Sequence, residues 1–169
     1  MPFDVLRWSI QYLHVLSGVL WFGAGFYTTL VQLPALLTLP PEQRMPAIAA
    51  LGPRQMRYVV RLAEVTIALG IINALLTGRL ARLGETIGTL WGWAIGIGAI
   101  LAIGLYVMLQ SRVRPAINRV VAVARAAQQG DASGTAELPA LARRIRTLGY
   151  VQMAIGAIIV LLMVTARFT

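Results

Sequence analysis

Three residue types that support much of protein chemistry are scarce or absent in this 169-residue chain. It has no cysteine, no lysine and a single histidine. Without cysteine there are no thiolate-held iron–sulfur clusters, no covalently attached c-type haem, no thiol nucleophile and no disulfide. Without lysine there is no lysine Schiff base. One histidine and scattered methionines are also too few ligands for copper or zinc transport.

Charge is scarce as well. Only 12% of the residues are charged, whereas soluble domains are about a quarter charged. Hydrophobic residues make up 58%, mean hydropathy is +0.74, and the apolar residues come in long blocks. The composition predicts one integral membrane domain, residues 1–169, in the inner (cytoplasmic) membrane as a multi-pass protein. The arginines that give the net charge of +9 lie between the apolar blocks, so we expect the partner to be lipid and not nucleic acid.

Four apolar blocks are each long enough for the roughly 20 residues that cross a bilayer. They predict an all-α, integral membrane four-helix bundle, with spans at about 8–33, 58–80, 87–109 and 148–166. The first is too long for a signal-peptide core, so we expect it to be retained.

The segments between the spans are rich in proline or polar residues. Pro34 is expected to end the first span, because proline disfavours helix in the residue before it. Residues 34–57 then form a proline-rich connector, or, as the alternative, contain a short surface helix over 42–51. Residues 111–147 form a long cytoplasmic loop between spans 3 and 4, with a helical extension over 112–129 that is interrupted or kinked near Pro115.

Arginines predict the orientation of the bundle. Four lie on one side of the four-span topology: Arg7, Arg79, Arg82 and Arg167. Eleven lie on the other: Arg44, Arg54, Arg57, Arg61, Arg112, Arg114, Arg119, Arg125, Arg143, Arg144 and Arg146. The positive-inside rule places the richer side in the cytoplasm, so both termini are expected outside.

Small residues recur every fourth position in two of the spans. Span 2 has Thr66, Gly70, Ala74 and Gly78, and span 3 has Gly88, Gly92 and Gly96, with Gly104 in register. Such stripes let membrane helices approach closely. They predict tight packing of spans 2 and 3 and a homo-oligomer formed through these stripes.

The single histidine lies in span 1 on a face of unusual composition. His14, Gly18, Trp21 and Gly25 share one helical stripe. Polar groups at membrane depth are costly and usually functional. We therefore consider a flat cofactor, held against the glycines and ligated by the imidazole; a histidine that hydrogen-bonds to a neighbouring helix is the alternative.

A haem on His14 would need further contacts. By depth, Met163 in span 4 is the candidate second axial ligand, although methionine in a membrane helix usually only packs. Arg79 and Arg82 lie on the correct side to neutralise propionates. Glu64 is the only carboxylate near a span interior, on the side opposite His14; it can pair with Arg61 or relay a proton or cation.

Span 1 resembles a known family. His14, Trp21-Phe22 and Phe26-Tyr27 are spaced as in the first helix of HemJ-type proteins, and a similar helix occurs in the broader CopD-like families. The resemblance implies a small four-helix membrane protein that binds haem b, with protoporphyrinogen IX oxidase activity in the HemJ type. This chain lacks the lysine of their third helix, since 94–97 are all apolar or glycine, and the arginine after the Phe-Tyr pair.

These observations predict a haem b-binding membrane protein with a redox or electron-transfer role, ligated by His14. Its redox partner would be a protein or a quinone. A more specific form of this hypothesis is a HemJ-like membrane oxidoreductase that oxidises a porphyrinogen. The missing lysine and arginine leave that activity undecided. The alternatives are a cofactor-free structural or accessory membrane subunit and, less favoured, a small transporter.

Overall fold

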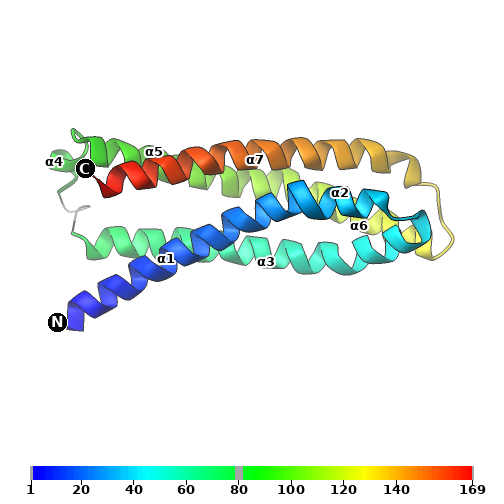
Figure 1. The fold of residues 1–169 in the computed structure, drawn as a ribbon, viewed down its shortest axis with the longest axis horizontal. Helices are drawn as coiled ribbons and strands as arrows, with labels where there is room; N and C mark the ends of the chain where they lie inside the picture. Colours follow the sequence, from blue (N-terminus) through cyan, green and yellow to red (C-terminus); the bar gives the residue numbers. More distant parts are fainter. Residues whose placement is uncertain (1, 79–81, 169) are drawn as a thin grey trace.

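The chain folds into four long antiparallel helical segments. The computed structural model describes residues 2–78 and 82–168, and nearly all of these are helical, as predicted. The segments are α1 (Pro2–Tyr27) with a π-helical stretch (Thr28–Gln32) and α2 (Leu33–Thr38); α3 (Pro41–Leu76); α5 (Leu90–Met108) with a second π-helical stretch (Leu109–Val113) and α6 (Arg114–Gln128); and α7 (Leu138–Arg167). Helix α4 (Leu83–Thr86) and a 3-10 turn (Thr135–Glu137) lie in the connections. Both termini lie at one end of the bundle (Figure 1).

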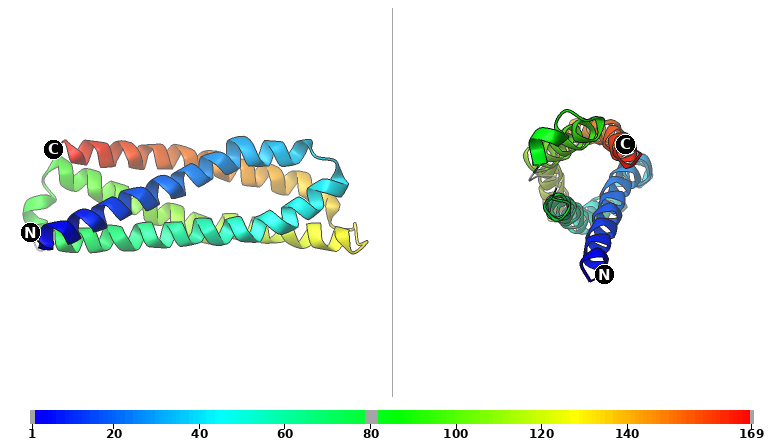
Figure 2. Two further views of the ribbon diagram at one scale, coloured as in Figure 1. Left: turned by 60° about the horizontal axis from the view of Figure 1, so that its bottom comes forward. Right: turned by 90° about the vertical axis from the view of Figure 1, so that its left-hand side faces the viewer.

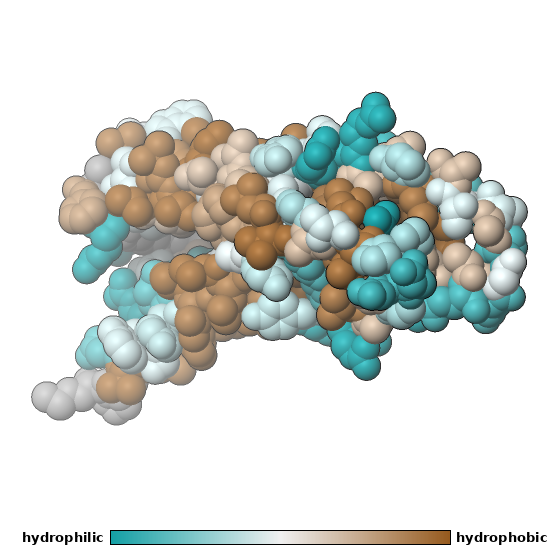
Figure 3. Space-filling view, turned by 45° about the vertical axis from the view of Figure 1, so that its right-hand side comes forward, coloured by the Kyte–Doolittle hydropathy of each residue, from teal (hydrophilic) through white to brown (hydrophobic). Residues whose placement is uncertain are grey.

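The segments are much longer than a bilayer requires. Helix α3 has 36 residues, which at 1.5 Å per residue is roughly 54 Å, against about 30 Å of hydrocarbon. Four segments are long and apolar enough to cross a membrane. Apolar residues gather over the half that bears the termini, and hydrophilic ones at the opposite end (Figure 3). The protein is therefore a multi-pass membrane bundle whose helices are longer than the hydrocarbon layer is thick.

The continuity of these helices corrects three predictions. Pro34 does not end the first span, and residues 41–57 are part of α3 and not a proline-rich connector. The long loop predicted between spans 3 and 4 is also mostly helix, because only 129–137 lie outside the second π-helical stretch, α6 and α7. The helical extension after span 3 is confirmed, and the predicted irregularity near Pro115 is the second π-helical stretch.

Each π-helical stretch ends two residues before a proline, whereas Pro46 and Pro53 lie within α3 without such a stretch. A proline ring clashes with the carbonyl four residues earlier in an α-helix. One residue before each proline, the backbone N–H reaches back five residues, from Leu33 to Thr28 and from Arg114 to Leu109. The widened turn relieves the clash, so each helix continues past its proline.

Helix ends follow local sequence signals. Helix α3 ends at Leu76, earlier than the predicted 80, because Gly78 adopts φ +65°, a left-handed conformation in which glycine carries no Cβ penalty. Helix α5 begins at Leu90, later than the predicted 87, where the Thr89 side chain accepts a hydrogen bond from the Gly92 N–H at 3.1 Å.

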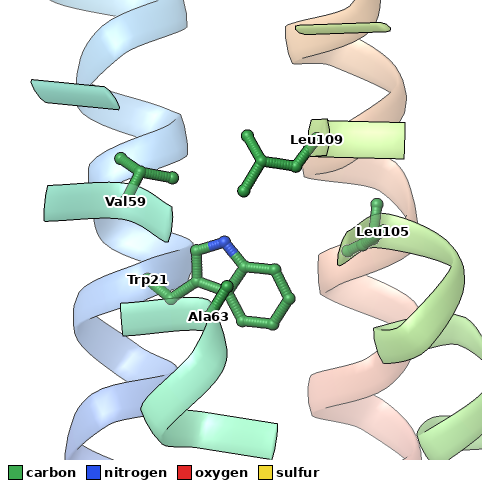
Figure 4. Packing of buried hydrophobic residues seen from close by; sticks show 5 residues of the cluster. All are labelled: Trp21, Val59, Ala63, Leu105 and Leu109. Carbon is green, nitrogen blue, oxygen red and sulfur yellow. The ribbon is translucent and has the colours of Figure 1, made fainter. Parts of the chain in front are cut away.

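The helices associate mainly as two pairs. Helix α1 packs along α3, α5 packs along α7, and α3 and α6 join the pairs at the arginine-rich end. Toward its N-terminus α1 slants away from α7 (Figure 2), and the surface of the bundle is cleft there (Figure 3). A buried cluster of Trp21, Val59, Ala63, Leu105 and Leu109 joins the pairs near mid-length (Figure 4).

The glycine stripes do not pack as predicted. Helices α3 and α5 meet at few positions, and Gly70 of α3 packs instead against His14 of α1. A Cβ at Gly96 or Gly104 of α5, or at Gly88 just before it, would meet nothing within 4 Å, whereas one at Gly92 would overlap the Thr86 backbone. Within one chain, therefore, the α5 stripe is open except at Gly92, and the α3 stripe is a surface for α1.

Candidate functional site

The imidazole of His14 is fixed against α3. Its Nδ1 lies 2.9 Å from the backbone oxygen of Thr66. A carbonyl oxygen only accepts hydrogen bonds, so Nδ1 carries the hydrogen, and in the neutral ring Nε2 keeps its lone pair. The ring lies over Gly70, where a Cβ would stand 2.9 Å from His14 Cε1. Gly70 is thus required for the imidazole to approach the helix closely.

The rest of the stripe also faces the interior, but other helices already cover it. A Cβ at Gly18 would contact the Thr66 methyl group at 3.6 Å, and one at Gly25 would overlap the side-chain amide of Gln152 on α7. Trp21 is only 7% exposed, packed in the central cluster. His14, Gly18, Trp21 and Gly25 therefore form an internal packing surface.

A porphyrin does not fit flat against this stripe. Pockets for cofactors usually hold 300–1,000 Å³. The cavity beside Gly25 measures about 60 Å³. A hollow of about 420 Å³ lies elsewhere, along one face of α7, and it is lined by Ala140, Arg143, Arg144, Thr147 and Leu148. The imidazole has the chemistry of an axial ligand, but the predicted glycine cradle is filled by protein.

The other predicted haem contacts are not brought to His14. Met163 packs on Gly98 in the interface of α5 and α7, whereas His14 packs on α3. Arg82 is exposed beside α4, at the end that bears the termini, and Arg79 lies outside the described residues. Within residues 2–78 and 82–168, no group of three or more histidines and carboxylates forms a metal site.

Glu64 belongs to a chain of hydrogen bonds that links α3 to α5 and α6. Arg61 donates to Glu64 at 2.8 Å, which confirms the predicted ion pair. The Tyr106 hydroxyl donates to the other carboxylate oxygen at 3.3 Å, and Gln110 donates to Tyr106 at 3.0 Å. Arg114 donates to Gln110 at 3.0 Å. Tyr106, Gln110 and Arg114 are spaced four residues apart, which the sequence shows directly. Their contact with Glu64 depends on how the helices pack.

A second group of polar contacts joins the first helical segment to α3. The amide of Asn73 donates to Gln11 Oε1, a contact between α1 and α3 near His14. Deeper in the bundle, the Gln55 amide donates to Thr28 Oγ1, and Thr28 in turn donates to the Ala24 carbonyl at 2.7 Å. Together with His14 these bonds join the first helical segment to α3 through polar side chains, as is common between membrane helices.

Comparison with known proteins adds no further assignment. No family model, no curated protein and no solved structure matches this chain. The residues themselves therefore carry the functional argument.

Proposed function

We propose that the protein is a haem b-binding integral membrane protein with a redox or electron-transfer role, in which Nε2 of His14 ligates the iron. The observation that supports this most directly is the bond from His14 Nδ1–H to the Thr66 carbonyl. Histidines that ligate metals almost always donate their second ring N–H to a carbonyl or carboxylate, which fixes the tautomer and the ring orientation. The resemblance of span 1 to HemJ-type and CopD-like proteins adds to this support.

In this proposal the haem supplies the one-electron chemistry and the protein supplies ligation and an apolar setting. His14 holds the iron, and the Thr66 carbonyl and Gly70 hold the imidazole. Side chains of other helices cover Gly18 and Gly25, so the haem cannot lie against the glycine stripe. In this proposal its position is set instead by the iron bound at Nε2 of His14. Arg82 and Arg79 are proposed to neutralise the propionates. Met163 is a weaker proposal for a second ligand, since it packs on another helix pair.

The proposed setting is the inner membrane, with both termini outside and the eleven arginines in the cytoplasm. The open glycines of α5 are the surface proposed for a homo-oligomer, because they have no neighbour within the chain. A protein or quinone is the proposed redox partner, and porphyrinogen oxidation is the narrower form of the activity.

The test is the absorption spectrum of the purified protein, expressed with haem supplied. We expect a Soret band that is lost or shifted in His14→Ala. Gln11→Ala is the matched control, because it removes another polar contact between α1 and α3 while leaving the imidazole. A protein without a Soret band, or a band unchanged by His14→Ala, would overturn the proposal.

The second candidate is a cofactor-free structural or accessory subunit, and the filled glycine stripe favours it. In that function His14 only joins α1 to α3. His14→Ala would then lower stability in a protein that has no colour, and haem added to the purified protein would leave its thermal unfolding unchanged. The absorption spectrum and the thermal unfolding with and without haem therefore distinguish the two candidates.

A further inference from the structure

A small, mostly apolar cavity with a few polar residues in its lining lies between the helical segments, where the apolar half of the bundle meets its arginine-rich half. Its volume is about 60 Å³. Two hydroxyls and two amides contribute to its lining, from Thr28, Thr29, Gln55 and Gln152. None of the residues that line it carries a charge. The cavity is thus suited to a small, neutral, hydrogen-bonding occupant.

An unsatisfied donor lies close to two of the residues that line this cavity. Trp21 Nε1 is buried and has no hydrogen-bond partner in the described part of the chain. Figure 4 shows this nitrogen on the edge of the indole ring nearest Val59 and Leu109. Both of these residues also line the cavity. Buried donors are nearly always paired with protein or with ordered water, so this N–H requires a partner.

We propose that the cavity binds one or two water molecules, one of which accepts a hydrogen bond from Trp21 Nε1–H. A water molecule occupies about 30 Å³ and needs two to four polar partners. The volume is sufficient, and Trp21 Nε1–H together with the threonine and glutamine side chains of the lining are the proposed partners. An ion is a poor occupant, because the lining contains no arginine to pair with an anion and no carboxylate to pair with a cation. A larger organic molecule would exceed the volume.

The widened turns of the backbone help to form this site. Thr28 and Thr29 come from the first π-helical stretch, and Leu109 and Val113 come from the second. Both stretches thus contribute side chains to one cavity, and π-helical turns are frequent at functional sites. The bound water would join the two helix pairs at this level. This inference does not depend on haem.

Trp21 can be observed alone in a variant in which Trp8, Trp91 and Trp93 are replaced by phenylalanine. With ¹⁵N-labelled tryptophan in lipid nanodiscs, we expect a cross-peak between the Trp21 indole N–H and a long-lived water. Absence of this cross-peak would overturn the proposal. So would an N–H shifted downfield without it, since that pattern means a direct bond to a glutamine side chain.

Two further variants in the same background test the polar partners. Combining Gln152→Leu with Thr29→Val removes an amide and a hydroxyl from the lining, and we expect loss of the water cross-peak. Met153→Leu on the same helix lies outside the lining and should retain it. Loss in both variants would mean that the signal reports general packing, and it would overturn the assignment.

Discussion

Replacing Gly70 with alanine tests the contact on which the site depends. A Cβ at this position would stand 2.9 Å from His14 Cε1 and 3.4 Å from Nδ1. The first distance is too short for two carbons, and the α3 backbone is held by its own helical bonds. The imidazole must therefore move away and release its bond to Thr66.

The expected effect follows from three contributions. Alanine in place of glycine in a helix stabilises by about 1 kcal/mol. Overpacking costs about 1–3 kcal/mol, and loss of the bond from His14 to Thr66 costs about 0.5–1.5 kcal/mol. The net result is a destabilisation of about 2 kcal/mol. At Gly23 of α1 a Cβ meets nothing within 4 Å, so Gly23→Ala should stabilise by up to about 1 kcal/mol.

The measurement is SDS-driven unfolding of both variants in mixed micelles, followed by circular dichroism. The ¹⁵N resonances of the imidazole report the bond to Thr66 independently. The reasoning is refuted if Gly70→Ala is as stable as Gly23→Ala and its imidazole resonances are unchanged. Both results together would mean that the close approach of His14 to Gly70 does not exist.

Three other predictions concern the polar contacts, the prolines and the topology. Tyr106→Phe should lower the unfolding free energy by less than about 1 kcal/mol. The Glu64 side chain that Tyr106 contacts is 36% exposed, and the Arg61 side chain paired with Glu64 is 81% exposed. A larger loss in the same SDS titration would contradict this. Pro34→Ala and Pro115→Ala should leave the helix content in far-ultraviolet circular dichroism unchanged, since both helices already continue past these residues; a change would show that the prolines set the helix ends. Reporters fused to the two termini should report the same side of the membrane, and opposite sides would exclude a four-span protein.

The sequence alone was sufficient for the class of fold. Long apolar blocks with little charge have one stable form in lipid, because every backbone group must be paired within its own helix. The ion pair of Arg61 with Glu64 was equally predictable, since three residues along a helix bring two side chains together. The prediction that the helix ends at Pro34 was wrong. Proline disfavours helix locally, but the helix continues past it through the widened turn at Thr28–Gln32.

Which faces meet was decided only by the tertiary structure. The periodicity of span 1 correctly groups His14 with Trp21, but it does not reveal that Gly70 and Gln152 from other helices cover that stripe. Small-residue spacing is the same in α3 and α5, yet one stripe receives α1 and the other stays open, because packing depends on how the helices cross. The cavity beside Trp21 likewise arises where four helical segments converge, a geometry that no single segment encodes.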